Sequence, residues 1–76
     1  MMMMVSEQKI DEMQNTLNYF VREVNMYRLQ GDYKNANDYL SMLLGGLSVY
    51  NALDFEPLEM IERYGEIELV KKHVRR

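Results

Sequence analysis

Carboxylates in the C-terminal third are the side chains whose spacing comes nearest to chemistry. Asp54 is followed by four glutamates at spacings of three, three and four residues: Glu56, Glu59, Glu62 and Glu66. On a helix, this spacing gathers the carboxylates on one flank. Such a cluster can hold Mg²⁺ or Ca²⁺, but metal sites in helical bundles combine carboxylates and histidines from several helices. We therefore expect a solvent-exposed acidic face and no metal site.

The same carboxylates form the strongest electrostatic feature of the chain. Residues 54–68 carry six acidic side chains and a single basic one, Arg63. A surface of one charge sign steers partners of the opposite sign. The sequence therefore predicts a docking face for a basic protein, made by Asp54, Glu56, Glu59, Glu62 and Glu66.

Other kinds of site chemistry find little support in the 76 residues. The chain has no cysteine, which excludes thiol catalysis, disulfides and thiolate metal sites. The one histidine, His73, has cations on both sides and no base or nucleophile beside it. Gly45-Gly46 lacks the lysine of a phosphate-binding loop. We expect no catalytic, cofactor-binding or metal-binding residues, and hence a protein that is not an enzyme.

Charge is distributed unevenly along the chain. Residues 1–70 hold all 12 acidic side chains, whereas four bases lie in the last six positions: Lys71, Lys72, Arg75 and Arg76. An acidic body repels nucleic acid, so binding of nucleic acid by this basic end is an alternative and not the expectation. No stretch reaches the ~18 apolar residues that a membrane span requires. The expected location is the cytoplasm, with no membrane partner.

Two heptad stripes predict the elements that position these groups. Apolar residues recur at spacings of 3-4-3-4-3 in two separate runs of six. This spacing is typical of helices that pack along their length. Gly31 can end the first helix and Asp32 can cap the second, and so short a junction makes the two helices antiparallel neighbours. The predicted helices span residues 7–30 and 33–53.

The C-terminal third is expected to add one or two short helices, over residues 55–64 and 66–75. Asp54 can cap the first and Gly65 can end it. The run that begins Glu66-Ile67-Glu68 alternates like a strand, but no other segment offers it a partner within the chain. A helix is therefore preferred, and a two-stranded ribbon between two chains is the alternative.

The second helix is apolar on more sides than one partner helix can cover, because residues 39–53 contain no charged side chain. We expect the all-α class: a single helical domain at residues 6–76, after a disordered start region at 1–5. It should assemble as a dimer or a higher helical-bundle oligomer. The residues assigned to self-association are Tyr19, Met26, Leu29, Tyr39, Met42, Leu44 and Val49.

Together these features predict a small, non-enzymatic protein–protein interaction module. Few alanines and many asparagines and tyrosines fit an accessory or inhibitory protein of a phage or another mobile element in an AT-rich genome, which is an association from composition. The first alternative is an oligomer that binds a nucleotide-like small ligand at its subunit interface, near Tyr39, Gly45, Gly46 and Tyr50. The second alternative is the nucleic-acid binder described above.

Overall fold

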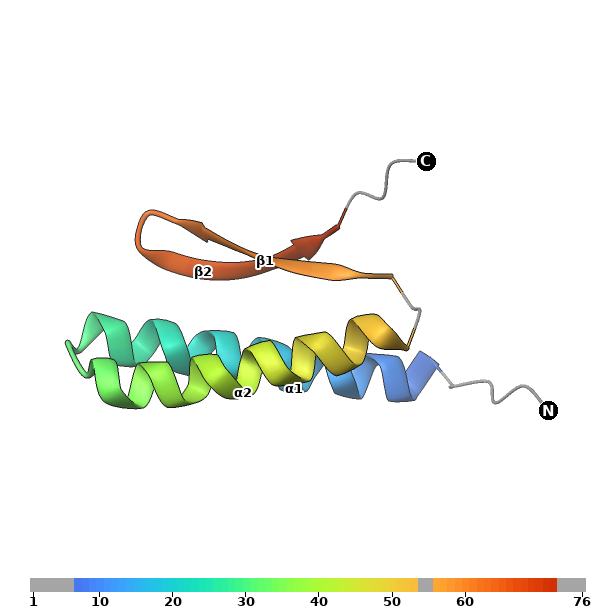
Figure 1. The fold of residues 1–76 in the computed structure, drawn as a ribbon, viewed down its shortest axis with the longest axis horizontal. Coiled ribbons are helices and arrows are strands. Elements are labelled where there is room, and N and C mark those ends of the chain that lie inside the picture. Colours follow the sequence, from blue (N-terminus) through green and yellow to red (C-terminus); the bar gives the residue numbers. More distant parts are fainter. Residues whose placement is uncertain (1–6, 54–55, 73–76) are drawn as a thin grey trace.

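The structure, a computed structural model, describes residues 7–53 and 56–72, which form two layers (Figure 1). The elements are helices α1 (Glu7–Leu29) and α2 (Tyr33–Ala52) and strands β1 (Leu58–Arg63) and β2 (Glu66–Lys71). The two helices lie antiparallel in one layer, and the two strands form a hairpin across one face of this layer. The opposite face of the helices is covered by none of the described elements.

The helical hairpin follows from the two heptad stripes and the junction between them. Both predicted helices are present, and each ends one residue earlier than expected. Gly31 adopts the left-handed φ of 78°, which confirms its role after the first helix. Asp32 caps α2 by accepting a hydrogen bond from the backbone N–H of Asn35 at 3.3 Å. The predicted disordered start, residues 1–5, lies outside the described residues.

The C-terminal third corrects the all-α prediction. The helices predicted at residues 55–64 and 66–75 are wrong, because the structure has an antiparallel β-hairpin there. Its register pairs Leu58 with Lys71 and Arg63 with Glu66. The alternating segment therefore has its strand partner within the same chain, immediately before it in the sequence.

A two-residue turn makes this pairing. Tyr64 and Gly65 have φ values of 55° and 80°. A type I′ turn requires positive φ at both central residues, and its twist matches that of a β-hairpin. Gly65 was expected to end a helix, because a helix end also uses a left-handed glycine. The helix-like spacing of the glutamates thus concealed a hairpin turn.

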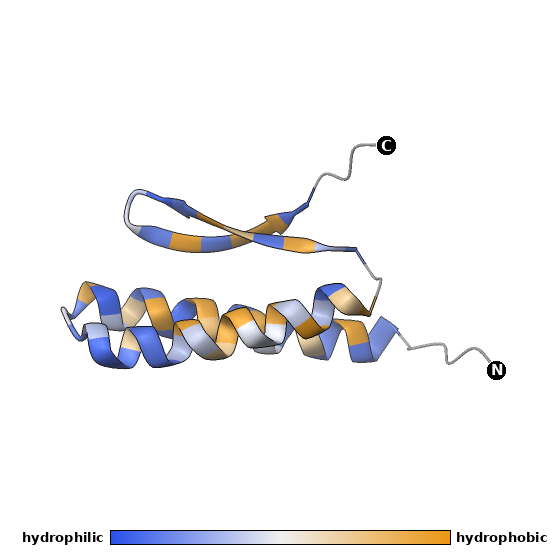
Figure 2. Ribbon diagram, viewed as in Figure 1, coloured by the Kyte–Doolittle hydropathy of each residue, from blue (hydrophilic) through white to orange (hydrophobic). Residues whose placement is uncertain are grey.

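Alternation along the strands gives the β-hairpin an inner and an outer face (Figure 2). Leu58, Met60 and Leu69 pack from the inner face against the core, and Ile67 is only 2% exposed. Eight described hydrophobic side chains are buried, seven of them on the helices: Leu17, Val21, Val24, Ala36, Leu43, Leu47, Tyr50 and Ile67. A core this small gives a short chain only modest stability.

Two asparagines fasten the β-hairpin to the helices. On the α1 side, the Asn25 amide accepts from the backbone N–H of Ile67 and donates to its carbonyl, both at 2.9 Å. On the α2 side, Asn51 makes the same pair of bonds with Leu58, at 2.9 and 2.8 Å. Each amide takes the place of a neighbouring strand residue, so it satisfies backbone groups at an open strand edge.

Candidate functional site

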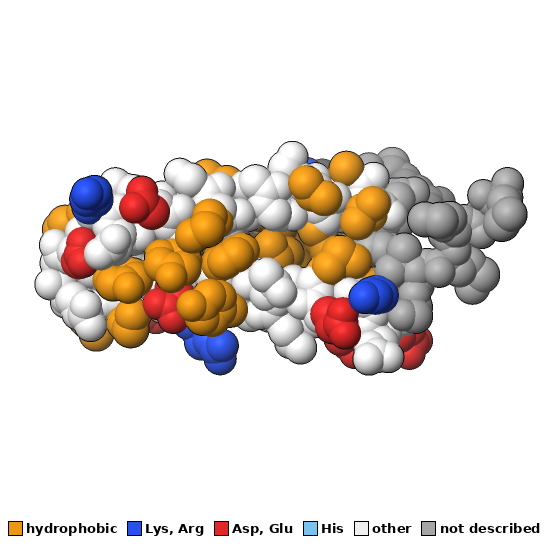
Figure 3. Space-filling view, turned by 90° about the horizontal axis from the view of Figure 1, so that it is seen from below, with side chains coloured by type: hydrophobic (Ala, Val, Ile, Leu, Met, Phe, Trp, Pro, Cys, Tyr) orange, Lys and Arg blue, Asp and Glu red, His pale blue; other side chains and the backbone are white. Residues whose placement is uncertain are grey.

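The uncovered face of the helical layer, which is the face away from the β-hairpin, carries hydrophobic side chains along the seam between α1 and α2 (Figure 3). On α2 these side chains belong to one stripe, since residues three or four positions apart share a helical face. Met42, Val49 and Leu53 of this stripe are 46%, 62% and 45% exposed. Tyr19 of α1 is 41% exposed. A continuous apolar surface of this kind is typical of a protein interaction site.

Aromatic rings fill the seam in the half of the uncovered face nearer the α1–α2 junction. Tyr39 stacks on Tyr27 across the seam, with ring centroids 5.7 Å apart. Tyr39 also meets Tyr19 edge-on at 6.3 Å and lies 6.2 Å from Phe20. These four rings are called the aromatic cluster below. They tie α2 to α1 through Tyr39, the one member from α2.

Two hydroxyls of the aromatic cluster hold their protons more tightly than free tyrosine does. A side-chain hydrogen bond with Tyr39 raises the pKa of Tyr19, and the carboxylate of Glu23 raises it further. Partial burial raises the pKa of Tyr27, with additions from Tyr39 and Glu23. Both phenols are therefore neutral at physiological pH, so this part of the surface presents rings with polar but uncharged tips.

The other half of the uncovered face is hollow. A depression of about 700 Å³ opens between the helices, and its lining includes Met13, Leu17, Phe20, Gly46 and Val49. Gly46 of α2 contributes no side chain to this lining. The helices also approach closely at this point: a Cβ added to Gly46 would lie 3.0 Å from Cδ2 of Leu17.

The residues named for a ligand site do not all reach this hollow. Gly46 and Tyr50 line it, whereas Tyr39 belongs to the aromatic cluster and Gly45 is not part of the lining. Tyr50 is 1% exposed, and its hydroxyl accepts a hydrogen bond from the side-chain amide of Gln14 at 2.9 Å. The hydroxyl is therefore engaged in holding α1 and α2 together.

The seven residues predicted for self-association do not all lie on the uncovered face. Four of them lie together on the uncovered face: Tyr19, Tyr39, Met42 and Val49. Met26 is seven residues beyond Tyr19 and so shares its flank of α1. Leu29, 89% exposed, lines a second depression beside the β-turn. Leu44 lies on the flank of α2 that carries Asn51, on the side of the β-hairpin.

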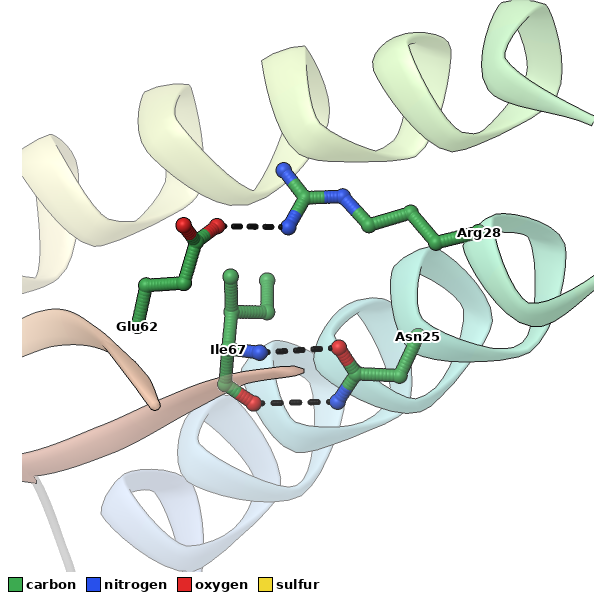
Figure 4. A network of polar contacts seen from close by, with 4 residues as sticks. All are labelled: Asn25, Arg28, Glu62 and Ile67. Atoms are coloured by element: carbon green, nitrogen blue, oxygen red, sulfur yellow. Dashed lines mark hydrogen bonds and ion pairs between the residues drawn. The ribbon is translucent and has the colours of Figure 1, made fainter. Parts of the chain in front are cut away.

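The predicted acidic residues do not share one flank, because alternate strand residues point to opposite faces. Glu59 and Glu66 lie on the outer face of the β-hairpin. Glu62 lies on the inner face, where its carboxylate is 2.7 Å from the Arg28 guanidinium of α1 (Figure 4). This ion pair joins the asparagine bonds in holding the hairpin on the helices.

The ends of the predicted acidic and basic segments are only partly described. Glu56 pairs with Lys71 at 3.3 Å, so one acid and one base neutralise each other. Four other residues named in the sequence analysis lie outside the described part of the chain: Asp54, His73, Arg75 and Arg76. Within residues 7–53 and 56–72, no three carboxylate or histidine side chains come close enough together to hold a metal ion.

Sequence reasoning missed the two asparagines that position the β-hairpin. Asparagine is a weak helix former, yet Asn25 and Asn51 lie inside helices, directly after the buried Val24 and Tyr50. A polar amide at the margin of a core stripe is the signal that could have indicated a structural hydrogen bond. The ligand-site alternative named Gly46 and Tyr50, but it missed the part of the hollow that α1 lines with Met13, Leu17 and Phe20.

The arrangement as a whole offers surfaces for binding: one apolar helical face and one charged strand face. In the described part of the chain, neither helix has the length and hydropathy to cross a membrane. Comparison of the chain with protein-family models, with curated proteins and with solved structures finds no match.

Proposed function

We propose that this chain is a small, non-enzymatic protein–protein interaction module of the cytoplasm that docks through the uncovered face of its helices. The observation that carries this proposal is the contrast between the two faces of one helical layer. The β-hairpin covers one face, and the other displays Met42 and Val49 about half exposed. An apolar helical surface of a partner protein is the complement that fits, because helices pack through such stripes.

The uncovered face approaches the size of an ordinary protein interface. α1 and α2 contain 23 and 20 residues, so the layer is about 30 Å long and about 20 Å wide. The face thus measures about 600 Å² before the relief of its side chains is counted, against roughly 800 Å² per partner in an ordinary interface. A partner that presents two packed helices, which together are also about 20 Å wide, can cover most of this face.

The outer face of the β-hairpin is the second docking surface of this module and fits a basic protein. Glu59, Glu66 and Glu68 lie on it with a single base, Arg63. Replacing Glu59 and Glu66 with lysine should slow association with such a protein, and added salt should slow the wild type in the same way. An unchanged association rate would remove this surface from the proposal.

A photo-reactive amino acid placed in the living cell tests the main docking surface. Val49, on the uncovered face, and Ser48, exposed on another side of α2, are adjacent and form a matched pair of sites. Irradiation should cross-link position 49 to a protein and leave position 48 with little product. Equal yields at both sites, or no protein adduct at position 49, would contradict docking through this face.

The hollow also supports a second candidate function, the binding of a small ligand. Its volume of about 700 Å³ is that of a typical ligand site. The mainly apolar lining favours an apolar molecule over the nucleotide-like ligand that the sequence analysis named as an alternative. A thermal-shift screen of apolar small molecules distinguishes this function, since a ligand that binds only the folded state raises the melting temperature. A screen without any such shift would reject it.

A further inference from the structure

We propose that the partner on the uncovered face is a second copy of this chain, turned antiparallel so that the aromatic cluster of each copy fills the hollow of the other. This inference rests on the proposed function and names the protein that the face binds. A surface that carries both a filled half and a hollow half can complement itself under two-fold symmetry. The uncovered face has both halves.

The positions of the two halves match those of a symmetric dimer. On α2, Tyr39 marks the aromatic cluster and Gly46 marks the hollow, and the residue midway between them is Met42 or Leu43. Helix α2 runs from Tyr33 to Ala52, so its own midpoint falls at the same place. A two-fold axis that crosses the helices there puts cluster over hollow on both sides. It also overlaps the two helical layers along their full length.

Residue sizes agree with this superposition. Tyr39 and Tyr19 supply large rings, and Tyr19 is 41% exposed without any described element above it. In the hollow, Gly46 supplies no side chain to the lining. Burying rings against a glycine-lined depression allows the close packing that interfaces share with protein interiors.

Charges at the margins of the face do not oppose this orientation. Lys9 lines the hollow, where it pairs with Glu12 at 3.5 Å. Glu23 lies beside the aromatic cluster, where its carboxylate acts on Tyr19 and Tyr27. An antiparallel partner brings the hollow end, where Lys9 and Glu12 neutralise each other, toward the cluster end, with Glu23.

The small core gives a reason for a second copy to bind. One described chain buries only eight hydrophobic side chains. Small folds without disulfides or metals often gain stability by associating. A dimer would cover Met42 and Val49 and leave both β-hairpins on the outside, with their acidic outer faces free for another protein.

Molar mass in solution tests this proposal, with the neighbours Val49 and Ser48 again as the matched pair. Light scattering at about 50 μM should give twice the chain mass of 9.1 kDa for the wild type. Ser48→Lys should keep that mass, whereas Val49→Lys should weaken association at least tenfold, because it places a charge inside the interface. Circular dichroism should show the same helix content in all three proteins, since both side chains are exposed.

A wild-type chain that is monomeric at this concentration would overturn the second-copy inference. A dimer that Val49→Lys leaves intact would overturn it as well, because the contact would then lie elsewhere. Neither result decides the proposed function, which the photo-cross-link at position 49 tests separately. If that cross-link captures a different protein, docking through the face stands and the second copy does not.

Discussion

The two faces of the helical layer belong to the same two helices, but the β-hairpin covers only one of them. On the covered face, Asn25 and Asn51 bind backbone groups of the strands, and Arg28 pairs with Glu62. On the uncovered face, the seam is lined by rings and by a hollow of about 700 Å³. The covered face is specified by directional polar bonds, whereas the uncovered face offers apolar area and shape.

This difference shows how a short chain can separate folding from binding. Hydrogen bonds with two defined partners fix the β-hairpin in one register and one position, since a slipped strand would leave the amides unpaired. Apolar packing is less directional, so it suits a surface that meets a separate molecule. The comparison predicts that removing polar side chains should destabilise the contact of the β-hairpin with the covered face. On the uncovered face, changes in side-chain size and charge should have the main effect.

The largest effect is expected from removing one asparagine of the covered face. Asn25→Ala deletes two hydrogen bonds to Ile67 and leaves partly buried backbone groups without a partner. We expect the free energy of unfolding to fall by about 2 to 3 kcal/mol. Asn15→Ala is the control, because Asn15 is exposed on the same helix and alanine there should raise stability by a few tenths of a kcal/mol. Urea unfolding of both variants checks this, and equal midpoints would show that the asparagine bonds contribute nothing.

Adjacent glycines of α2 give the next largest effect, with opposite signs. Gly46→Ala brings a Cβ to 3.0 Å from the buried Leu17, so we expect a loss of about 1 to 3 kcal/mol by overpacking. Gly45→Ala meets no atom within 4 Å and should gain up to about 1 kcal/mol through helix propensity. Thermal unfolding of the two variants measures the difference. If both gain stability, Leu17 moves freely and the seam is not tightly packed there.

The β-turn should respond to backbone conformation alone. Tyr64 is 98% exposed and has a φ of 55°, so its ring contributes no packing while its backbone is strained. Tyr64→Asn should stabilise the chain by about 0.5 to 1 kcal/mol, because asparagine tolerates the left-handed conformation. Tyr64→Val should have the opposite sign. Urea midpoints that do not change for either variant would contradict a type I′ turn.

The smallest effect is expected in the titration of the Tyr19 and Tyr27 hydroxyls on the uncovered face. Because the folded-state pKa values of Tyr19 and Tyr27 lie above the ordinary 10.0, folding favours the protonated phenols. Their contribution to stability is complete below about pH 10 and is lost as the pH rises through the folded-state values. Phenolate absorbance should therefore extend to higher pH in the wild type than in a Tyr19→Phe, Tyr27→Phe double variant. Identical titration curves would contradict the contacts in the aromatic cluster.

Local signals explain how much of this fold the sequence could predict. The heptad stripes, Gly31 and Asp32 predict the helical hairpin, because each acts on its immediate neighbours. The β-hairpin was missed because glutamates at residues 56–66 also match a helical flank, and because Tyr64-Gly65 is not one of the usual turn pairs. The strands are also held by contacts from outside the segment, those of Asn25 with Ile67 and of Asn51 with Leu58, and the local pattern of the segment does not reveal them.

The candidate site, too, was predictable only in part. Exposure of Tyr19, Met42 and Val49 was predictable from their place outside the heptad stripes, and the structure shows them exposed. Their arrangement into a filled half and a hollow half depends on how the two helices are aligned along their axes. The sequence periodicity predicts which side faces a neighbour, but it does not fix that alignment.

Distances between spin labels test the paired uncovered faces most directly. The chain has no cysteine, so single labels can be attached at Ser41→Cys, near the middle of α2, and at Gln30→Cys, beyond the end of α1. In the antiparallel dimer, labels at position 41 lie close to the two-fold axis and give a short distance between copies. Labels at position 30 lie about 18 Å along the helices from it and should be about 35 Å apart. Equal short distances at both positions, or no coupling between copies, would contradict the pairing of cluster with hollow.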